Sequence, residues 1–91
     1  MTAREHFVVC GLVQGVGFRW FVRETAERLA LSGWVRNAPD GSVEAEAEGQ
    51  PRSLAEFATA LRQGPASARV DAVDVRGIPA KRDRADFEIT R

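Results

Sequence analysis

A glycine-rich segment near the N-terminus combines residue types that suit phosphate binding. It reads Gly11-Leu12-Val13-Gln14-Gly15-Val16-Gly17-Phe18-Arg19, between an apolar run at 7–10 and a helix-like stretch at 18–30. A glycine-rich turn between a strand and a helix directs backbone N–H groups into one small space, at the positive end of the helix dipole. The segment therefore predicts an anion site, and phosphate is the anion that suits it best.

Arg19 adds to this prediction because its position is electrostatically unfavourable. The first turn of a helix already carries partial positive charge, so a cation is disfavoured there. A residue that breaks a local rule often does so at a functional site, and a guanidinium can bind two phosphate oxygens through its planar fork. The alternative is a structural turn with a solvated arginine, and the loop alone does not decide between them. The segment matches neither the Walker A loop nor the dinucleotide-binding fingerprint.

Composition limits the classes of protein that this chain resembles. Its 91 residues predict one domain over residues 1–91, with a single core. Thirteen basic and thirteen acidic residues cancel, which disfavours a nucleic-acid partner. No stretch approaches membrane-spanning length. The single cysteine, Cys10, excludes an internal disulfide and, with the polar start of the chain, indicates a cytoplasmic location.

Hydrophobic periodicity predicts a protein of mixed secondary structure. We expect strands at about 5–12, 34–37, 42–48, 70–75 and 87–89 and helices at about 18–30 and 53–63. The order is βαββαβ followed by a short C-terminal strand. This order fits the fold class α+β and a ferredoxin-like two-layer sandwich.

Local signals predict where the elements end or bend. Gly33 is expected as a left-handed cap of the first helix. Ser53 and Glu56 form a capping-box pattern for the second helix, while Pro51 offers an alternative start one turn earlier. Val70 lies out of phase with the valines that follow it, which predicts a bulge or a bend in that strand.

The expected chain path brings Asn37 to the same end of the sheet as the glycine-rich loop. The helix descends about 18 Å from the loop at about 1.5 Å per residue. The following strand climbs back about 13 Å by Asn37 at about 3.3 Å per residue. Asparagine is depleted in strands, so one interpretation is a residue that flanks the turn at Pro39-Asp40-Gly41. The functional alternative is an amide that holds a water molecule.

Two motifs together resemble those of the acylphosphatase family. The first is Gly11-x-Val13-Gln14-Gly15-Val16-x-Phe18-Arg19, and the second is Gly33-Trp34-Val35-x-Asn37-x-x-Asp40-Gly41-x-Val43-Glu44. Both match the family pattern at nearly every fixed position and with the expected separation. The closing Phe87-Glu88-Ile89 also resembles the last strand of the family, so the resemblance covers essentially the whole chain.

The resemblance implies hydrolysis of acyl phosphates to a carboxylate and inorganic phosphate by a monomeric enzyme without metal or cofactor. It implies that Arg19 and Asn37 are the catalytic pair and that two helices cover one face of a mainly antiparallel sheet. The expected phosphate-binding residues are Gln14, Gly15, Val16, Gly17, Phe18 and Arg19. The chemistry needs the phosphate bound and a water aimed at phosphorus, and we assign the second task to Asn37.

Several other residues have structural and functional interpretations. His6 and Trp34 are expected to be structural or surface residues, and Cys10 a small core residue. Trp20 and Phe21 are expected either to flank an acyl group or to pack the helix. The alternating glutamates Glu44, Glu46 and Glu48 predict a solvated strand face, because no histidine or aspartate completes a cation site.

Three other functions stay open on the sequence alone. A non-enzymatic anion-binding module would need the loop but not Asn37. A domain of a hydrogenase-maturation carbamoyltransferase would share the first motif, although the chain's own start and its end on a strand favour a free-standing protein. A single-stranded RNA binder would need exposed sheet aromatics and basic flanks, whereas this chain has no tyrosine and a glutamate-rich third strand.

Overall fold

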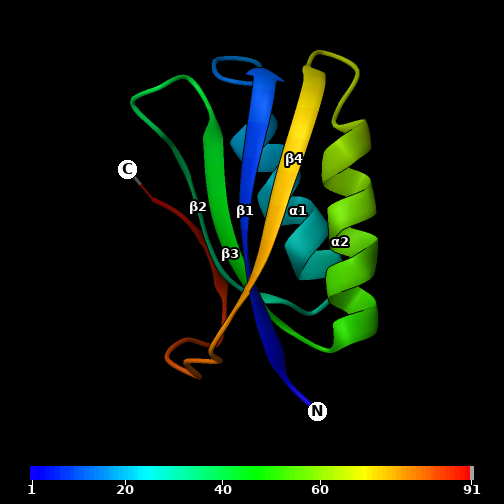
Figure 1. Cartoon of the computed structure of the whole chain (residues 1–91), viewed down its shortest axis with the longest axis vertical. Coiled ribbons are helices and arrows are strands. Elements are labelled where there is room, and N and C mark those ends of the chain that lie inside the picture. The colour runs from blue at the N-terminus through cyan, green and yellow to red at the C-terminus, as the bar shows by residue number, and fades with distance from the viewer. Residues whose placement is uncertain (91) are drawn as a thin grey trace.

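The strand and helix patterns of the sequence separate into two layers. The computed structural model describes residues 1–90 and shows both helices on the same face of one sheet (Figure 1). The elements are β1 (Ala3–Leu12), α1 (Phe18–Arg28), β2 (Ser32–Asn37), β3 (Val43–Gly49), α2 (Pro51–Gln63), β4 (Arg69–Ile78) and β5 (Phe87–Ile89). The expected α+β, ferredoxin-like architecture is confirmed. No helix within residues 1–90 is long and apolar enough to cross a lipid bilayer.

The strand order of the sheet is β4-β1-β3-β2-β5. Every neighbouring pair is antiparallel except β2 and β5, which are parallel. Because β1 and β2 both run antiparallel to β3, they run parallel to each other and end at the same edge of the sheet. In Figure 1 the loop after β1 and the turn between β2 and β3 both lie at the top.

The core lies between the sheet and the helices. Phe7 of β1 packs edge-on against Phe57 of α2, with ring centroids 5.1 Å apart, and Phe87 of β5 lies 6.1 Å from the same ring. Phe18 and Val22 of α1 are also fully buried. Burial of Phe18 in the first turn of α1 anchors the end of the glycine-rich loop, so the backbone of the next residue, Arg19, is held in place.

The first helix ends at a residue other than the predicted one. The chain turns at Ala30, whose φ is 57°, and the N–H groups of Ala30 and Leu31 donate to the carbonyls of Glu27 (3.1 Å) and Ala26 (2.9 Å). These paired bonds form a Schellman cap. The prediction of Gly33 as the cap was wrong. Gly33 lies within β2, where a Cβ atom would come within 1.9 Å of the Glu46 carbonyl oxygen, so its small size serves strand pairing.

Two further local predictions had different outcomes. The prediction of a capping box at Ser53 and Glu56 was wrong, because α2 begins at Pro51 after Gln50 and no side chain makes a hydrogen bond at the cap. The alternative start at Pro51 is confirmed. The predicted irregularity at Val70 is also confirmed. The pairing of β1 with β4 shifts register between Cys10, opposite Ala72, and Gly11, opposite Val70.

The face of the sheet away from the helices carries an ion-pair network. Arg4 is only 2% exposed, and its guanidinium lies 2.8 Å from Glu46 and 3.1 Å from Glu48. Glu44 accepts a 2.8 Å hydrogen bond from His6 Nε2 and a 2.6 Å bond from Arg36. The prediction of a solvated glutamate face was therefore wrong, because cations on β1 and β2 lie beside β3.

Cys10 is exposed, so its prediction as a core residue was also wrong. Side chains alternate between the two faces of a strand. Cys10 lies an even number of residues from Arg4 and His6 and therefore shares their face, whereas Phe7 and Val9 point into the core.

The network lowers the pKa of two carboxyl groups. The pKa of Glu48 is lowered first by a hydrogen bond from the Lys81 backbone N–H, with Arg4 and the Arg82 N–H adding to the effect against the opposing effect of burial. Burial raises the pKa of Glu44, but hydrogen bonds from His6 and Arg36 outweigh it, so that pKa is lowered as well. A carboxyl group whose pKa is lower in the folded state stabilises the fold above its unfolded pKa of about 4.3.

We predict that the free energy of unfolding falls as the pH decreases below about 5, as the unfolded chain takes up protons that the folded chain excludes. Glu48→Gln should be less stable than the wild type at pH 7, and the difference should shrink towards pH 3. Urea unfolding at several pH values measures this. Glu56→Gln, at an exposed carboxylate on α2, is the matched control. An equal pH dependence in the two variants would contradict the role of Glu48.

Candidate active site

A cavity of about 280 Å³ lies at the edge of the sheet where β1 and β2 end. Arg19 comes from the first turn of α1 and Asn37 from the last residue of β2, and both line this cavity. The cavity thus brings together the two residues that the motifs predicted as a pair. The residues that line it are Val13, Gly15, Gly17, Phe18, Arg19, Trp20, Asn37 and Ile89.

The glycine-rich loop presents uncapped backbone N–H groups. Gly15 and Gly17 have φ values of 75° and 78°, which glycine adopts at little cost. Gly17 is the N-cap of α1, where no side chain caps the helix and no acidic residue occupies the first turn. The first helical bond runs from Phe21 N–H to the Gly17 carbonyl, so the N–H groups before Phe21 have no acceptor in the helix. The loop therefore provides donors and positive potential for an anion.

The Arg19 side chain adds a positive charge to the same space. It is half-buried, and no carboxylate of residues 1–90 lies within salt-bridge distance of it. The carboxylates Glu44, Glu46 and Glu48 instead pair with cations on the open face of the sheet. Arg19 thus has its charge available for an external anion.

Asn37, which lines the same cavity as Arg19, holds an unpartnered polar atom. Its amide oxygen Oδ1 is buried, yet no group of the described chain donates a hydrogen bond to it. Buried polar atoms in folded proteins nearly always have a partner. An unpartnered amide oxygen on a cavity-lining residue is a group that a hydrogen-bond donor entering the cavity would satisfy.

Gln14 ties the loop to the β2–β3 turn. Its Nε2 donates to the carbonyl oxygens of Ala38 (2.7 Å) and Ser42 (2.9 Å). Asp40 closes the same turn by accepting bonds from the backbone N–H (2.9 Å) and hydroxyl (2.6 Å) of Ser42, and the hydroxyl bond is the main cause of its lowered pKa. Since Asn37 directly precedes Ala38, Gln14 couples the position of Asn37 to that of the loop.

The predicted loop residues thus divide into two groups. Gly15, Gly17, Phe18 and Arg19 line the cavity, whereas Gln14 and Val16 are not among the lining residues. The Gln14 side-chain nitrogen is occupied by the turn, and the Val16 carbonyl accepts a 2.8 Å hydrogen bond from Ser67 Oγ. The bridging role of Gln14 and the contact with Ser67 were missed, because no local sequence pattern signals a bond across 24 or 51 residues.

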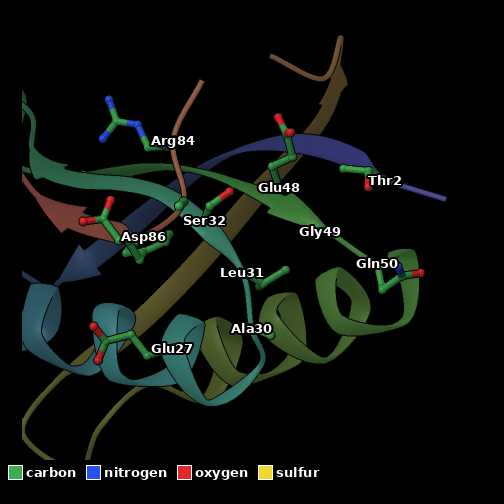
Figure 2. A pocket seen from close by; sticks show the side chains of 12 residues that line it. Thr2, Glu27, Ala30, Leu31, Ser32, Glu48, Gly49, Gln50, Arg84 and Asp86 are labelled. Carbon is green, nitrogen blue, oxygen red and sulfur yellow. The ribbon is translucent and has the colours of Figure 1, made fainter. Parts of the chain in front are cut away.

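A larger cavity, of about 670 Å³, lies at the opposite end of the strands. Figure 2 shows the carboxylates of Glu27, Glu48 and Asp86 around it, with the guanidinium of Arg84. Glu48 is paired with Arg4, but Glu27 and Asp86 against Arg84 still give this cavity a negative balance, which disfavours a phosphate group. Phosphate chemistry is therefore better placed in the smaller cavity.

Comparison with known proteins agrees with this geometry. The model of the acylphosphatase family matches residues 5–89. The chain belongs to the acylphosphatase family. It is 48% identical over 88 residues to the acylphosphatase of Rubrobacter xylanophilus, covering 97% of this chain and 80% of the relative. The resemblance inferred from the two motifs is confirmed, and with it the enzyme class, acylphosphatase.

Solved acylphosphatase structures share the fold. The acylphosphatase of Bacillus subtilis superposes with a TM-score of 0.93 at 36% identity, and the match covers 100% of both chains. Full-length HypF superposes with a TM-score of 0.92 at 28% identity, but this chain covers only 12% of it. The acylphosphatase fold thus occurs both as a whole chain and as one part of a larger protein.

We predict that Gln14→Glu destabilises the protein by about 1–3 kcal/mol, because a carboxylate cannot donate to the carbonyls of Ala38 and Ser42 and instead sets its own oxygens against theirs, leaving each carbonyl only its backbone bond within the turn. The substitution keeps the size of the side chain, so the effect reports the hydrogen bonds. Urea unfolding at pH 7 measures the change, and Gln63→Glu at the exposed end of α2 is the control. Wild-type stability in Gln14→Glu would show that the bridge contributes nothing.

Proposed function

We propose that this chain hydrolyses the carboxyl–phosphate bond of acyl phosphates, giving a carboxylate and inorganic phosphate, at the cavity shared by Arg19 and Asn37. One observation carries the proposal. Within residues 1–90, a guanidinium without a carboxylate partner and a buried amide oxygen without a donor line one cavity beside uncapped N–H groups. A site that only bound an anion would need the guanidinium and the N–H groups but not the unpartnered amide oxygen of Asn37.

The phosphate group is bound by the glycine-rich loop. The backbone N–H groups from Gly15 to Arg19 and the Arg19 guanidinium donate to its oxygens, and the Gln14 N–H lies at the start of the same loop. These donors are fixed before substrate binds, because Gly17 caps the helix and Phe18 is buried in the core. Such preorganised donors stabilise the charge that the equatorial oxygens carry in the transition state.

Asn37 positions the water that attacks phosphorus. The water donates a hydrogen bond to Asn37 Oδ1 and directs an oxygen lone pair at phosphorus. A bond forms between this oxygen and phosphorus, and the phosphorus–oxygen bond to the acyl group breaks. Its electron pair leaves on the carboxylate, which is a good leaving group and needs no proton. A phosphate oxygen of the substrate accepts the proton of the water, since the described residues that line the cavity include no aspartate, glutamate or histidine.

The proposal assigns all charge stabilisation to Arg19 and the backbone, so we expect the reaction to need no metal or cofactor. A single domain over residues 1–91, a monomeric state and a cytoplasmic location stay predictions. Size-exclusion chromatography with light scattering tests the monomer, for which a mass near 10.0 kDa is expected.

We predict that Asn37→Ala lowers kcat for benzoyl phosphate by about 100-fold or more while the affinity for inorganic phosphate stays within about twofold, because the water loses its position but the loop keeps its donors. Arg19→Ala should lower both kcat and the affinity for inorganic phosphate. Hydrolysis is measured by ultraviolet absorbance and phosphate binding by calorimetry. Arg62→Ala, on the exposed end of α2, is the arginine control.

Two outcomes would contradict these assignments. Loss of phosphate binding in Asn37→Ala would contradict the assignment of Asn37 to positioning water. An unchanged phosphate affinity in Arg19→Ala would contradict the assignment of Arg19 to phosphate binding. A folded wild-type protein that binds phosphate but hydrolyses no acyl phosphate would favour the anion-binding module.

A further inference from the structure

Trp20 is an exposed aromatic residue at the wall of the candidate active site. It directly follows Arg19 in the first turn of α1 and lines the same cavity as Asn37. Its side chain is 56% exposed, whereas the buried residues of this helix are Phe18, Val22, Thr25 and Ala26. Trp20 therefore points away from the core, and helix packing does not account for it.

The indole ring of Trp20 is held by a neighbouring cation. The guanidinium carbon of Arg23, one turn further along α1, lies 4.2 Å from the ring centroid. This is a cation–π contact, which favours one orientation of the ring. No salt bridge joins Arg23 to another residue of the described chain, and its buried Nε has no hydrogen-bond partner there, so no ion pair competes with the contact between its guanidinium and the ring.

The cavity has a polar part and an apolar part. Arg19, Asn37 and the loop N–H groups form the polar part, which the phosphate and the water occupy in the proposed reaction. The apolar part consists of the side chains of Val13, Phe18, Trp20 and Ile89. The acyl group of a bound substrate must lie against this apolar part or extend past it into solvent, and Trp20 is the most exposed of these side chains.

We propose that Trp20, oriented by Arg23, is a specificity-determining residue that binds the acyl group of the substrate and favours flat, aromatic acyl groups over small aliphatic ones. This inference rests on the proposed function of the same cavity. An indole offers a large apolar surface that stacks on another ring, and a methyl group covers little of it. Arg23 is then a positioning residue, since it acts through Trp20.

The test compares two substrates and two inert analogues. Wild type, Trp20→Ala, Trp20→Phe and Arg23→Ala are assayed with benzoyl phosphate and acetyl phosphate. Binding of benzylphosphonate and methylphosphonate to the same proteins is measured by calorimetry. Trp34→Phe is the matched control, because Trp34 lies on β2 beside His6 and does not line the cavity. Circular dichroism confirms that each variant is folded.

We expect Trp20→Ala to lower the preference for the aromatic member of each pair by about 10-fold, seen in KM and in the dissociation constant rather than in kcat. Trp20→Phe should keep most of the preference, Arg23→Ala should lose part of it, and Trp34→Phe should keep all of it. An unchanged preference in Trp20→Ala, or an equal loss for both members of each pair, would overturn the inference.

The analogues separate this inference from the proposed function. If the wild type hydrolyses neither substrate but prefers benzylphosphonate through Trp20, the proposed reaction fails and the aromatic site stands. If the wild type hydrolyses both substrates and Trp20→Ala discriminates between them as the wild type does, the reaction stands and the aromatic site fails.

Discussion

The register of β3 determines whether this protein has a site at all. In the sheet, Val43 of β3 lies opposite Val9 of β1 on one side and opposite Asn37 of β2 on the other. This alignment brings the end of β1, from which the glycine-rich loop leaves, to the same edge as Asn37. A slip of one residue would turn the core side chains of β3 towards the open face and displace Asn37 from the loop.

The two faces of β3 also separate the charges of the molecule. The small apolar residues Val43, Ala45 and Ala47 lie under the helices, and the glutamates between them pair with Arg4, His6 and Arg36 on the other face. Those carboxylates are thereby paired on the face away from the helices. The loop end of the sheet keeps the charge of Arg19 and the helix dipole for an anion, and Gln14 holds that loop against the β2–β3 turn.

Much of this arrangement could be predicted because its signals are local. The periodicity of the strands and helices, the loop before α1 and the chain path back to Asn37 follow from residues close in the sequence. The errors at Gly33 and the β3 glutamates share one physical cause. The environment of each of these residues depends on a partner from a distant strand, such as the Glu46 carbonyl beside Gly33 or Arg4 beside Glu48. The sequence of a single segment does not identify that partner.

The most direct test of the account is an amide ¹⁵N–¹H correlation titration of the labelled protein with inorganic phosphate. If the account is right, the largest shifts fall on the backbone amides of residues 15–19 and on the side-chain amide of Asn37, and they saturate together with one dissociation constant. Shifts centred instead on Ser32, Gln50 and Arg84 at the opposite cavity, or none at the loop, would contradict it.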